Sequence, residues 1–398
     1  MARTIERSLV VDLRRRLHGT PNIPQVLLGP RQVGKTTAVL QVLREWRGPS
    51  HYATADLPAP PTADWITAQW QIARSLGGRG RTLLVLDEVQ KIPRWSEVVK
   101  ALVDEDRRHA ARLRIVLLGS SSLLVAQGLS ESLAGRFELH HAPHWSLPEC
   151  RAAFGWDLDR WLYFGGYPGA APLARGRERW AQYVRNSLIE TVLSRDVLHL
   201  AKIAKPALLR QLFLLACQMP AEIVAFNKML GHLQDAGNTV TLSHYLELLS
   251  GAYLVSGLPR WSPARARLRA SSPKLVVWNN ALVNAMSSLT FAQVRGRPDL
   301  WGRIVENAVG AQLLAEAVTG AISVSYWREG PHEVDYVVTR GSTVLAIEVK
   351  SGRPRPLRGL DAFRRRYPGA KTLVVGSGGV ALEVFFESRV SRWLGRRE

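Results

Sequence analysis

The sequence is poor in cysteine and contains no long apolar stretch. Only Cys150 and Cys217 occur among its 398 residues, so neither a disulfide framework nor a cysteine-rich metal site is predicted. No apolar run reaches the length of about 18 residues that a membrane-spanning helix needs. Residues 1–16 also lack the apolar core of a signal peptide. We therefore expect two buried thiols, no membrane contact and a location in the reducing cytoplasm.

Acidic residues are scarce relative to basic ones. The chain has 53 Lys and Arg residues against 33 Asp and Glu residues, a formal net charge of +20. Residues 351–398 alone hold 11 basic residues against 4 acidic ones. Such an excess favours an anionic partner, with DNA as the first candidate. A general preference for arginine on the surface is the alternative. A protein partner and oligomerisation are both compatible with the sequence.

A phosphate-binding motif lies near the N-terminus. Residues 23–28 are mostly apolar and predict a buried strand that leads into GPRQVGKT at residues 29–36. This segment fits the pattern G-x-x-x-x-G-K-[ST], in which the glycines let backbone amides turn towards phosphate oxygens. Lys35 would place its charge on the β- and γ-phosphates, and Thr36 would offer its hydroxyl to Mg²⁺. The predicted nucleotide contacts in this segment are Gly29, Pro30, Arg31, Gln32, Val33, Gly34, Lys35, Thr36 and Thr37.

Two further apolar segments end in polar residues. Residues 82–88 predict a strand that ends in Asp87 and Glu88. Asp87 would hold Mg²⁺ through its water shell, and Glu88 would orient or polarise the attacking water. Residues 113–118 predict another strand, after which Ser120 and Ser121 could sense the γ-phosphate, a plain serine-rich loop being the alternative. Alternating strands and helices around such a motif predict a parallel sheet covered on both faces. ATP and Mg²⁺ are the predicted cofactors.

A family resemblance rests on several segments in order. GPRQVGKTT, LLVLDEVQKIPRW, VLLGSSSLLV and SLAGRFELHHAPHWSLPE resemble the AAA-14 type P-loop ATPases, which carry a DUF4143 C-terminal region. The resemblance covers nearly the whole chain. It implies that Arg136 contacts the nucleotide or a neighbouring subunit, a structural salt bridge being the alternative. The residues around Arg195 and Asp196 are a second candidate for that role.

The middle of the chain predicts helices over residues 180–200, 206–218, 221–233 and 242–250, followed by a short strand over 251–256. Short helices, a strand and a basic wing are typical of a winged helix-turn-helix, which the resemblance also implies. Thr241 or Ser243 is the predicted cap of the recognition-like helix. Because that helix has few basic residues, a role in packing or dimerisation is the alternative. The predicted basic wing consists of Arg260, Arg265, Arg267, Arg269 and Lys274.

The C-terminal part predicts three strands, over residues 323–327, 333–338 and 344–350. Residues two apart in a strand share a face, so Glu348 and Lys350 should point together, and towards Asp335 if the strands are neighbours. Carboxylates and a lysine on one face indicate a divalent metal site. The arrangement resembles the PD-(D/E)xK nuclease fold, which implies Glu306 as one more acid. Retained DNA cleavage and an inert scaffold both stay open.

Together these features predict an α/β protein with three domains. They are a P-loop ATPase domain (1–145), a helical and winged-helix-like domain (146–275) and a restriction-endonuclease-like domain (276–398). The predicted function is ATP binding and hydrolysis coupled to a DNA-directed, metal-dependent nuclease-like domain, with a regulatory ATPase on an inert scaffold as the alternative. The predicted catalytic residues are Lys35, Glu88, Asp335, Glu348 and Lys350. The predicted metal ligands are Thr36, Asp87, Glu306, Asp335 and Glu348.

Overall fold

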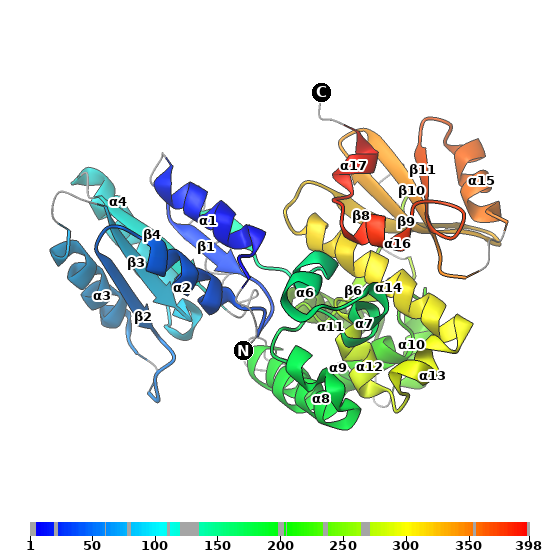
Figure 1. Cartoon of the computed structure of the whole chain (residues 1–398), viewed down its shortest axis with the longest axis horizontal. Coiled ribbons are helices and arrows are strands. Elements are labelled where there is room, and N and C mark those ends of the chain that lie inside the picture. The colour runs from blue at the N-terminus through cyan, green and yellow to red at the C-terminus, as the bar shows by residue number, and fades with distance from the viewer. Residues whose placement is uncertain are drawn as a thin grey trace. The chain divides into compact units, whose positions relative to one another are not determined.

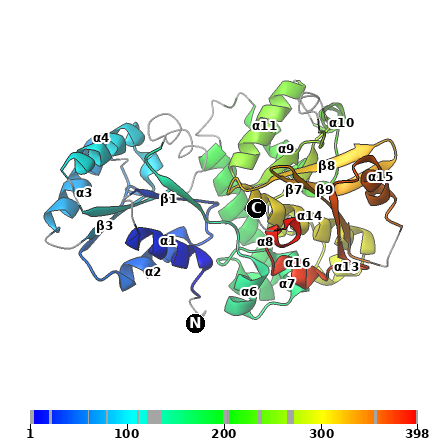
Figure 2. The ribbon, with the colours of Figure 1, turned by 90° about the horizontal axis from the view of Figure 1, so that it is seen from above.

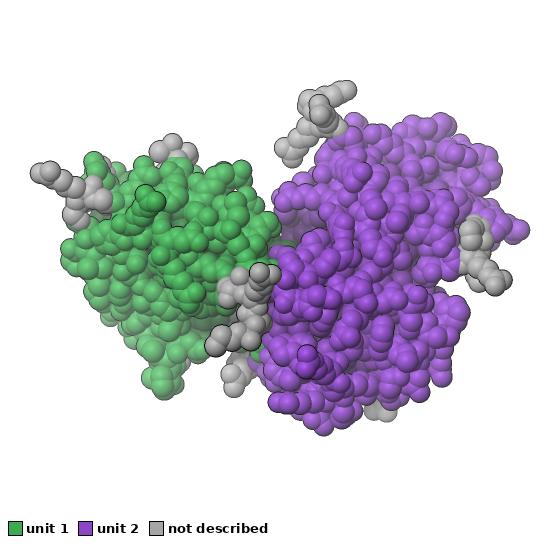
Figure 3. Space-filling view, viewed as in Figure 1, with its two compact units in different colours: residues 1, 3–143 green, residues 2, 144–398 purple. Residues whose placement is uncertain are grey.

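The chain divides into two compact units. The computed structural model describes residues 5–19, 23–59, 61–77, 81–109, 112–119, 135–197, 203, 205–233, 238–263, 271–352 and 356–395, without the side chains of residues 195 and 196. Unit 1 spans Arg3–Pro143 and unit 2 spans His144–Glu398 (Figure 3). Unit 2 thus contains both the predicted middle and C-terminal domains, and their boundary at residue 275 stays a prediction.

Unit 1 is built on a five-stranded parallel sheet with the order β2-β3-β4-β1-β5. Its strands are β1 (Gln25–Leu28), β2 (Ser50–Thr54), β3 (Thr82–Asp87), β4 (Leu113–Leu118) and β5 (Glu138–His141). Every residue of β1, β3 and β4 is buried, as expected for parallel strands that are covered on both faces. The predicted α/β fold and the strands predicted near residues 23–28, 82–88 and 113–118 are confirmed.

Helices cover both faces of this sheet. Figures 1 and 2 show α1 (Ser8–His18) and α2 (Lys35–Glu45) on one side, and α3 (Ala63–Ser75) and α4 (Trp95–Arg108) on the other. Successive side chains of a strand point to opposite faces. Leu83 and Val85 of β3 accordingly join the apolar cluster under α1 and α2. Leu84 and Leu86 join the cluster under α3 and α4.

Unit 2 begins with a helical part. It contains α6 (Leu147–Phe154), α7 (Leu158–Phe164), η2 (Ala171–Arg175), α8 (Arg177–Tyr183), the π-helical segments η3 (Val184–Ile189) and η4 (Val192–Val197), α9 (Pro206–Gln218), α10 (Phe226–His232) and α11 (Thr239–Gly251). The antiparallel hairpin of β6 (Val255–Leu258) and β7 (Lys274–Val277) follows. Helices followed by a hairpin are compatible with a winged helix, which stays a prediction.

Two details of this region differ from the sequence-based expectation. The cap of α11 is Asn238, whose Oδ1 accepts a hydrogen bond from Thr241 N at 2.9 Å, so the predicted caps Thr241 and Ser243 lie inside the helix. Asparagine prevails because it stands one position before the first helical residue, where its side chain reaches the free amides of the first turn. The predicted strand over residues 251–256 begins later, at Val255, because α11 extends to Gly251.

The predicted basic wing also needs correction. Arg265, Arg267 and Arg269 lie outside the described residues. Lys274, which was expected on the wing surface, is 0% exposed in β7. Basic residues in a run are expected at the surface unless the fold brings carboxylates next to them. Lys274 is such an exception, because it is paired with Glu306 and Asp335.

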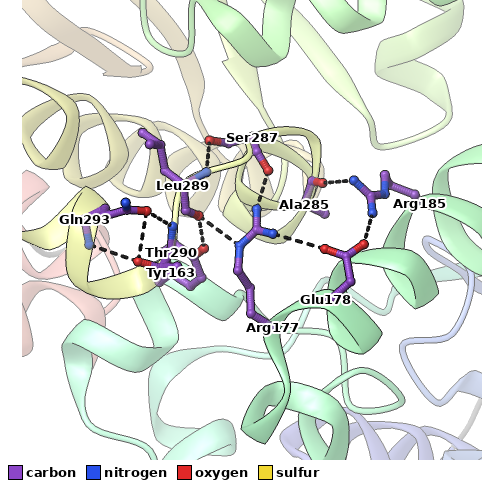
Figure 4. A network of polar contacts seen from close by, with 9 residues as sticks. All are labelled: Tyr163, Arg177, Glu178, Arg185, Ala285, Ser287, Leu289, Thr290 and Gln293. Atoms are coloured by element: carbon purple, nitrogen blue, oxygen red, sulfur yellow. Dashed lines mark hydrogen bonds and ion pairs between the residues drawn. The ribbon is translucent and has the colours of Figure 1, made fainter.

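A network around Arg177 fixes the turn between α12 (Asn280–Met286) and α13 (Phe291–Arg295) (Figure 4). Its guanidinium donates to the carbonyl oxygens of Leu289, at 3.1 Å from Nε, and of Ser287. Tyr163 Oη of α7 donates to the same Leu289 oxygen at 2.8 Å. These bonds to part-buried carbonyl groups hold the turn against α7 and α8.

The last part of unit 2 is a four-stranded sheet with helices on both faces (Figure 1). Its order is β11-β10-β9-β8, and only β10 and β11 run parallel. Phe363 of α15 packs against Trp327 and Ala346 on one face. On the other face Tyr336 Oη donates to the carbonyl oxygen of Glu306 in α14 at 2.8 Å. The elements are α14 (Pro298–Ala317), β8 (Ser323–Glu329), β9 (His332–Arg340), β10 (Thr343–Lys350), α15 (Arg358–Arg366), β11 (Lys371–Gly376), α16 (Leu382–Phe386) and α17 (Ser391–Leu394).

The helices and the two cysteines bear on the expectations about membrane contact and thiols. None of the helices in that part of the chain has the length and apolar character that crossing a membrane requires. Cys150 and Cys217 are buried free thiols, as predicted. Burial raises the pKa of the Cys217 thiol, so this residue behaves as a small apolar side chain.

Candidate functional site

The motif at residues 29–36 forms the turn between β1 and α2, and both of its fixed glycines are required. Gly34 has a φ of 88°, in the left-handed region that residues with a Cβ rarely adopt. At Gly29 an added Cβ would lie 2.2 Å from the carbonyl oxygen of Ala142. The loop therefore curls tightly at one end and packs closely against the segment after β5 at the other.

Lys35 is the first residue of α2, and its side chain folds back into this loop. Its Nζ donates hydrogen bonds to the carbonyl oxygens of Gly29 at 2.9 Å and Pro30 at 2.7 Å. The side chain is buried, at 8% exposure. The N-terminal end of α2 adds the positive end of the helix dipole at the same place. The loop thus concentrates positive charge where a phosphate would bind.

Arg7, just before α1, supports the loop and was missed by the sequence analysis. It is 4% exposed. Its Nη1 donates to the carbonyl oxygen of Val33 at 3.1 Å, and its Nη2 donates to that of Pro143 at 3.0 Å. No motif includes Arg7, because these contacts join parts of the chain that only the fold brings together. Arg7 therefore ties the loop to the end of unit 1.

Asp87, at the end of β3, accepts two hydrogen bonds on one oxygen. Thr36 Oγ1 donates to Asp87 Oδ2 at 2.9 Å, and Tyr52 Oη donates to the same oxygen at 2.9 Å. Tyr52 lies in β2, the parallel neighbour of β3. Burial and the negative charge of Asp87 raise the pKa of Tyr52, so this hydroxyl stays a donor. The structure brings Thr36 and Asp87 together as predicted, and adds Tyr52.

Glu88 follows Asp87 in an unusual backbone conformation. Its φ is 56°, in the left-handed region, which costs a residue with a side chain about 1–2 kcal/mol. Gln90 Nε2 donates a hydrogen bond to Glu88 Oε2. Strained residues of this kind concentrate at functional sites. The turn places a second carboxylate directly after the one that contacts Thr36.

The side chains at this end of β3 fit Mg²⁺. A hydroxyl and a carboxylate already in contact, Thr36 and Asp87, are the oxygen donors that this ion takes from proteins. Mg²⁺ usually adds waters and substrate phosphates to one or two such donors. The described residues contain no group of three or more His, Cys, Asp or Glu side chains that could hold a metal ion by themselves.

The other predicted nucleotide contacts have mixed outcomes. Residues 30–33 lie in the loop and Thr37 lies in the first turn of α2. Ser120 and Ser121 lie outside the described residues, as do the side chains of Arg195 and Asp196. Arg136 Nε lies 3.0 Å from Asp104 Oδ1 of α4, which is the structural salt bridge that the sequence left as the alternative. A role of Arg136 towards nucleotide stays a prediction.

A second cluster of charged side chains lies in unit 2 and contains all the predicted nuclease-site residues. Lys350 Nζ donates to Glu348 Oε1 at 2.6 Å on β10. Asp335 of β9, the antiparallel neighbour of β10, accepts a hydrogen bond from Val349 N at 2.7 Å. The predicted sharing of one face by Glu348 and Lys350 is therefore observed.

Lys274 completes this cluster and is its least exposed member. Its Nζ lies 2.6 Å from Glu306 Oε1, 3.5 Å from Glu333 Oε1 and 3.7 Å from Asp335 Oδ1. It also lies 4.9 Å from the centre of the Tyr336 ring, over its face. Although burial alone lowers the pKa of Lys274, the charges of Glu306 and Asp335 raise it overall. The ammonium is therefore charged at neutral pH.

The carboxylates of the cluster are also perturbed. Burial raises the pKa of Glu306 to about 7, with Lys274 acting in the opposite direction and Asp335 adding to the shift. Burial and Asp335 raise the pKa of Glu348 to about 7, against the effect of Lys350. Glu348 Oε2 is buried and accepts no hydrogen bond from the described residues. Burial and mutual repulsion thus disfavour the charged forms of these two carboxyl groups, and Lys274 and Lys350 act against both effects.

These residues do not fit a divalent metal as they stand. The ammonium of Lys274 already lies between Glu306 and Asp335, two of the three predicted ligands. Glu348, the third, is paired with Lys350. A metal would need carboxylate oxygens about 2.0–2.6 Å away and would be repelled by both ammonium groups. The geometry of this cluster therefore supports no metal-dependent catalytic step in unit 2.

Three successive segments of the chain match known domain families. Residues 22–150 match the AAA domain family of the AAA-14 type. Residues 155–293 match DUF8612 and residues 301–387 match DUF4143, both of them domains of unknown function. The DUF8612 match covers much of the segment for which the sequence predicts a winged helix.

Relatives cover most of the chain. An uncharacterized protein of Mycobacterium bovis and one of Mycobacterium tuberculosis are each 28% identical over 345 residues, which are 86% of this chain and 73% of the relative. A solved Walker-type ATPase of Pyrococcus abyssi is 16% identical with a TM-score of 0.46, over 71% of this chain and 95% of its own. The P-loop geometry and the family matches agree that residues 22–150 are similar to AAA domains with a P-loop, and that residues 301–387 are similar to DUF4143 domains.

Proposed function

We propose that unit 1 binds ATP with Mg²⁺ and hydrolyses it. The observation that carries the proposal is the contact between Thr36 Oγ1 and Asp87 Oδ2 at 2.9 Å. This contact joins the P-loop to Asp87 at the C-terminal end of β3. An NTP-Mg²⁺ site requires both of these parts. The AAA domain match over residues 22–150 supports the same function.

The residues of the loop would bind the phosphates. Amide groups of residues 29–34 and the N-terminus of α2 present positive charge to the β- and γ-phosphates. Lys35 would exchange the carbonyl oxygens of Gly29 and Pro30 for phosphate oxygens. Arg7 would keep the backbone at Val33 in place during this exchange.

The residues at the end of β3 would support hydrolysis. Thr36 and Asp87 would hold Mg²⁺, which when bound neutralises charge on the phosphates and favours departure of ADP. Glu88, next to Asp87, would orient the water that attacks the γ-phosphate. Because the backbone at Glu88 is left-handed, its side chain points in a different direction from that of a residue in an extended strand.

The direct test is a measurement of ATP binding and phosphate release by the full chain and by Lys35→Ala. Since hydrogen bonds to charged groups contribute about 1.5–3 kcal/mol, we expect ATP affinity to fall about 10- to 100-fold and phosphate release to be lost. Lys100→Ala, which removes a half-buried lysine of α4, is the control and should behave like wild type. Absence of ATP turnover by wild type with Mg²⁺ would refute the hydrolysis proposal, and equal ATP binding by Lys35→Ala would refute the assigned site.

Tyr52→Phe tests how Asp87 is positioned. The variant removes the hydrogen bond to Asp87 Oδ2 but keeps the ring. A single hydrogen bond contributes about 0.5–1.5 kcal/mol, so we expect the Mg²⁺ concentration for half-maximal turnover to rise about 2- to 10-fold. ATP binding without Mg²⁺ should stay unchanged. A lower melting temperature with an unaltered Mg²⁺ requirement would show that Tyr52 only stabilises the fold.

The DNA partner and a nuclease step in unit 2 stay predictions of the sequence. Cleavage would need a metal at Asp335 and Glu348, and the position of Lys274 argues against one. The basic excess of the chain supports an anionic partner without indicating which unit binds it.

A further inference from the structure

A buried lysine lies among carboxylates that the sequence resemblance assigns to a metal. Lys274 comes from β7, Glu306 from α14 and Asp335 from β9. The lysine is 0% exposed, and the side chains of Glu306 and Asp335 are each 16% exposed. An unpaired charge in such a place would be very unfavourable, so the ammonium and the carboxylates depend on each other.

We infer that Lys274 supplies the positive charge that a divalent metal would otherwise supply. The cluster is then a set of salt bridges that holds β7, α14 and β9 together inside unit 2 without a metal. This inference concerns a site outside unit 1 and is independent of the proposed ATPase. It assigns to Lys274 a role that its place in a basic run did not indicate.

The distances support this substitution. An ammonium group has three N–H donors and no acceptor. Lys274 Nζ lies 2.6 Å from Glu306 Oε1, 3.5 Å from Glu333 Oε1 and 3.7 Å from Asp335 Oδ1. The other oxygen of Asp335 accepts from Val349 N. Within the described residues, Lys274 Nζ is buried close to these carboxylates without meeting one in hydrogen-bond geometry, and Glu348 Oε2 is buried without a donor. The attraction at Lys274 is therefore that of an ion pair, and a single carboxylate oxygen without a donor is a poor site for a metal.

The neighbouring contacts show what the cluster joins. Asn307, next to Glu306 on α14, is 0% exposed. It accepts a hydrogen bond from Val277 N and donates one to Val277 O, both at 2.8 Å. β7 is therefore attached to α14 at two points, by the hydrogen bonds of the Asn307 side chain to the backbone of Val277 and by the ion pair at Lys274. Through Asp335 the same lysine reaches the four-stranded sheet, so the charge holds three elements together.

The test measures Mn²⁺ binding by the full chain without nucleotide, using electron paramagnetic resonance of free Mn²⁺. Asp87→Asn serves as the parent, because it weakens the metal site of unit 1. We expect the parent to take up no Mn²⁺ at millimolar concentration, and its melting temperature to be the same with Mn²⁺ and with EDTA. Mn²⁺ binding by this parent that is lost on adding Asp335→Asn or Glu348→Gln would overturn the inference. Because this measurement uses no substitution at Lys274, it tests the inference even if variants of Lys274 do not fold.

A second variant tests the substitution itself. Adding Lys274→Ala to the parent removes the ammonium and leaves the carboxylates, so we expect Mn²⁺ binding to appear and the melting temperature to rise when Mn²⁺ is added. Asp335→Asn should abolish that gain. The control is Lys228→Ala, at an exposed lysine of α10, which should bind no Mn²⁺. A folded Lys274→Ala protein that binds no Mn²⁺ would show that Lys274 does not stand in for a cation.

Discussion

Replacing Glu88 with glutamine is expected to lower ATP turnover about 100- to 10,000-fold, the usual range for a group that acts on the reacting water. ATP affinity should stay close to that of wild type, because the contact of Lys35 with the loop and the contact of Thr36 with Asp87 do not involve Glu88. Glutamine has nearly the same shape and can accept the hydrogen bond from Gln90. It meets the same backbone strain at a φ of 56°, so the fold should not change.

The measurement is single-turnover phosphate release together with equilibrium binding of a fluorescent ATP analogue. The matched control is Glu97→Gln on α4, which changes a carboxylate that is 50% exposed and paired with Arg94. It should leave both quantities unchanged. Turnover by Glu88→Gln within a few-fold of wild type would show that another group orients the water. Loss of ATP binding would show that the carboxylate supports the site rather than the reaction.

The residues of the candidate site in unit 1 could be named from the sequence because most of them lie in two short segments. The loop glycines, Lys35 and Thr36 lie within eight residues, and a buried strand ending in acids identifies Asp87 and Glu88. Tyr52 could not be found in this way. Its contact with Asp87 depends on β2 being the neighbour of β3, and strand order is not encoded in a short motif.

Unit 2 shows the same limit more strongly. Strand periodicity identified β9 and β10, and with them the common face of Glu348 and Lys350. It gave no sign that β7 would bring Lys274 to the same carboxylates. Composition suggested a solvated wing because a basic run usually is one. Whether a lysine is exposed or buried depends on partners distant in sequence, and these become known only with the fold.

The energetic role of Lys274 leads to the largest expected effect on stability. Replacing it with methionine keeps most of the volume and removes the charge, so Glu306 and Asp335 are left without their buried cation. Breaking a buried ion pair on one side costs about 3–5 kcal/mol, and we expect the free energy of unfolding of unit 2 to fall by that amount. The measurement is urea unfolding of the full chain, in which circular dichroism and tryptophan fluorescence monitor the transition of unit 2. Lys228→Met at an exposed position is the control and should have little effect.

The double variant Lys274→Met with Glu306→Gln separates lost charge from lost packing. If the loss comes from an uncompensated carboxylate, neutralising Glu306, the closest partner at 2.6 Å, should restore about 0.5–3 kcal/mol, the size of coupling seen between residues in contact. Glu306→Gln alone should also destabilise, because it leaves Lys274 with its more distant partners Glu333 and Asp335. Strictly additive losses in the double variant would contradict the claim that Lys274 stabilises unit 2 through its ion pairs. They would mean that the lysine contributes through its aliphatic stem, which packs inside unit 2 whatever the charge at its end.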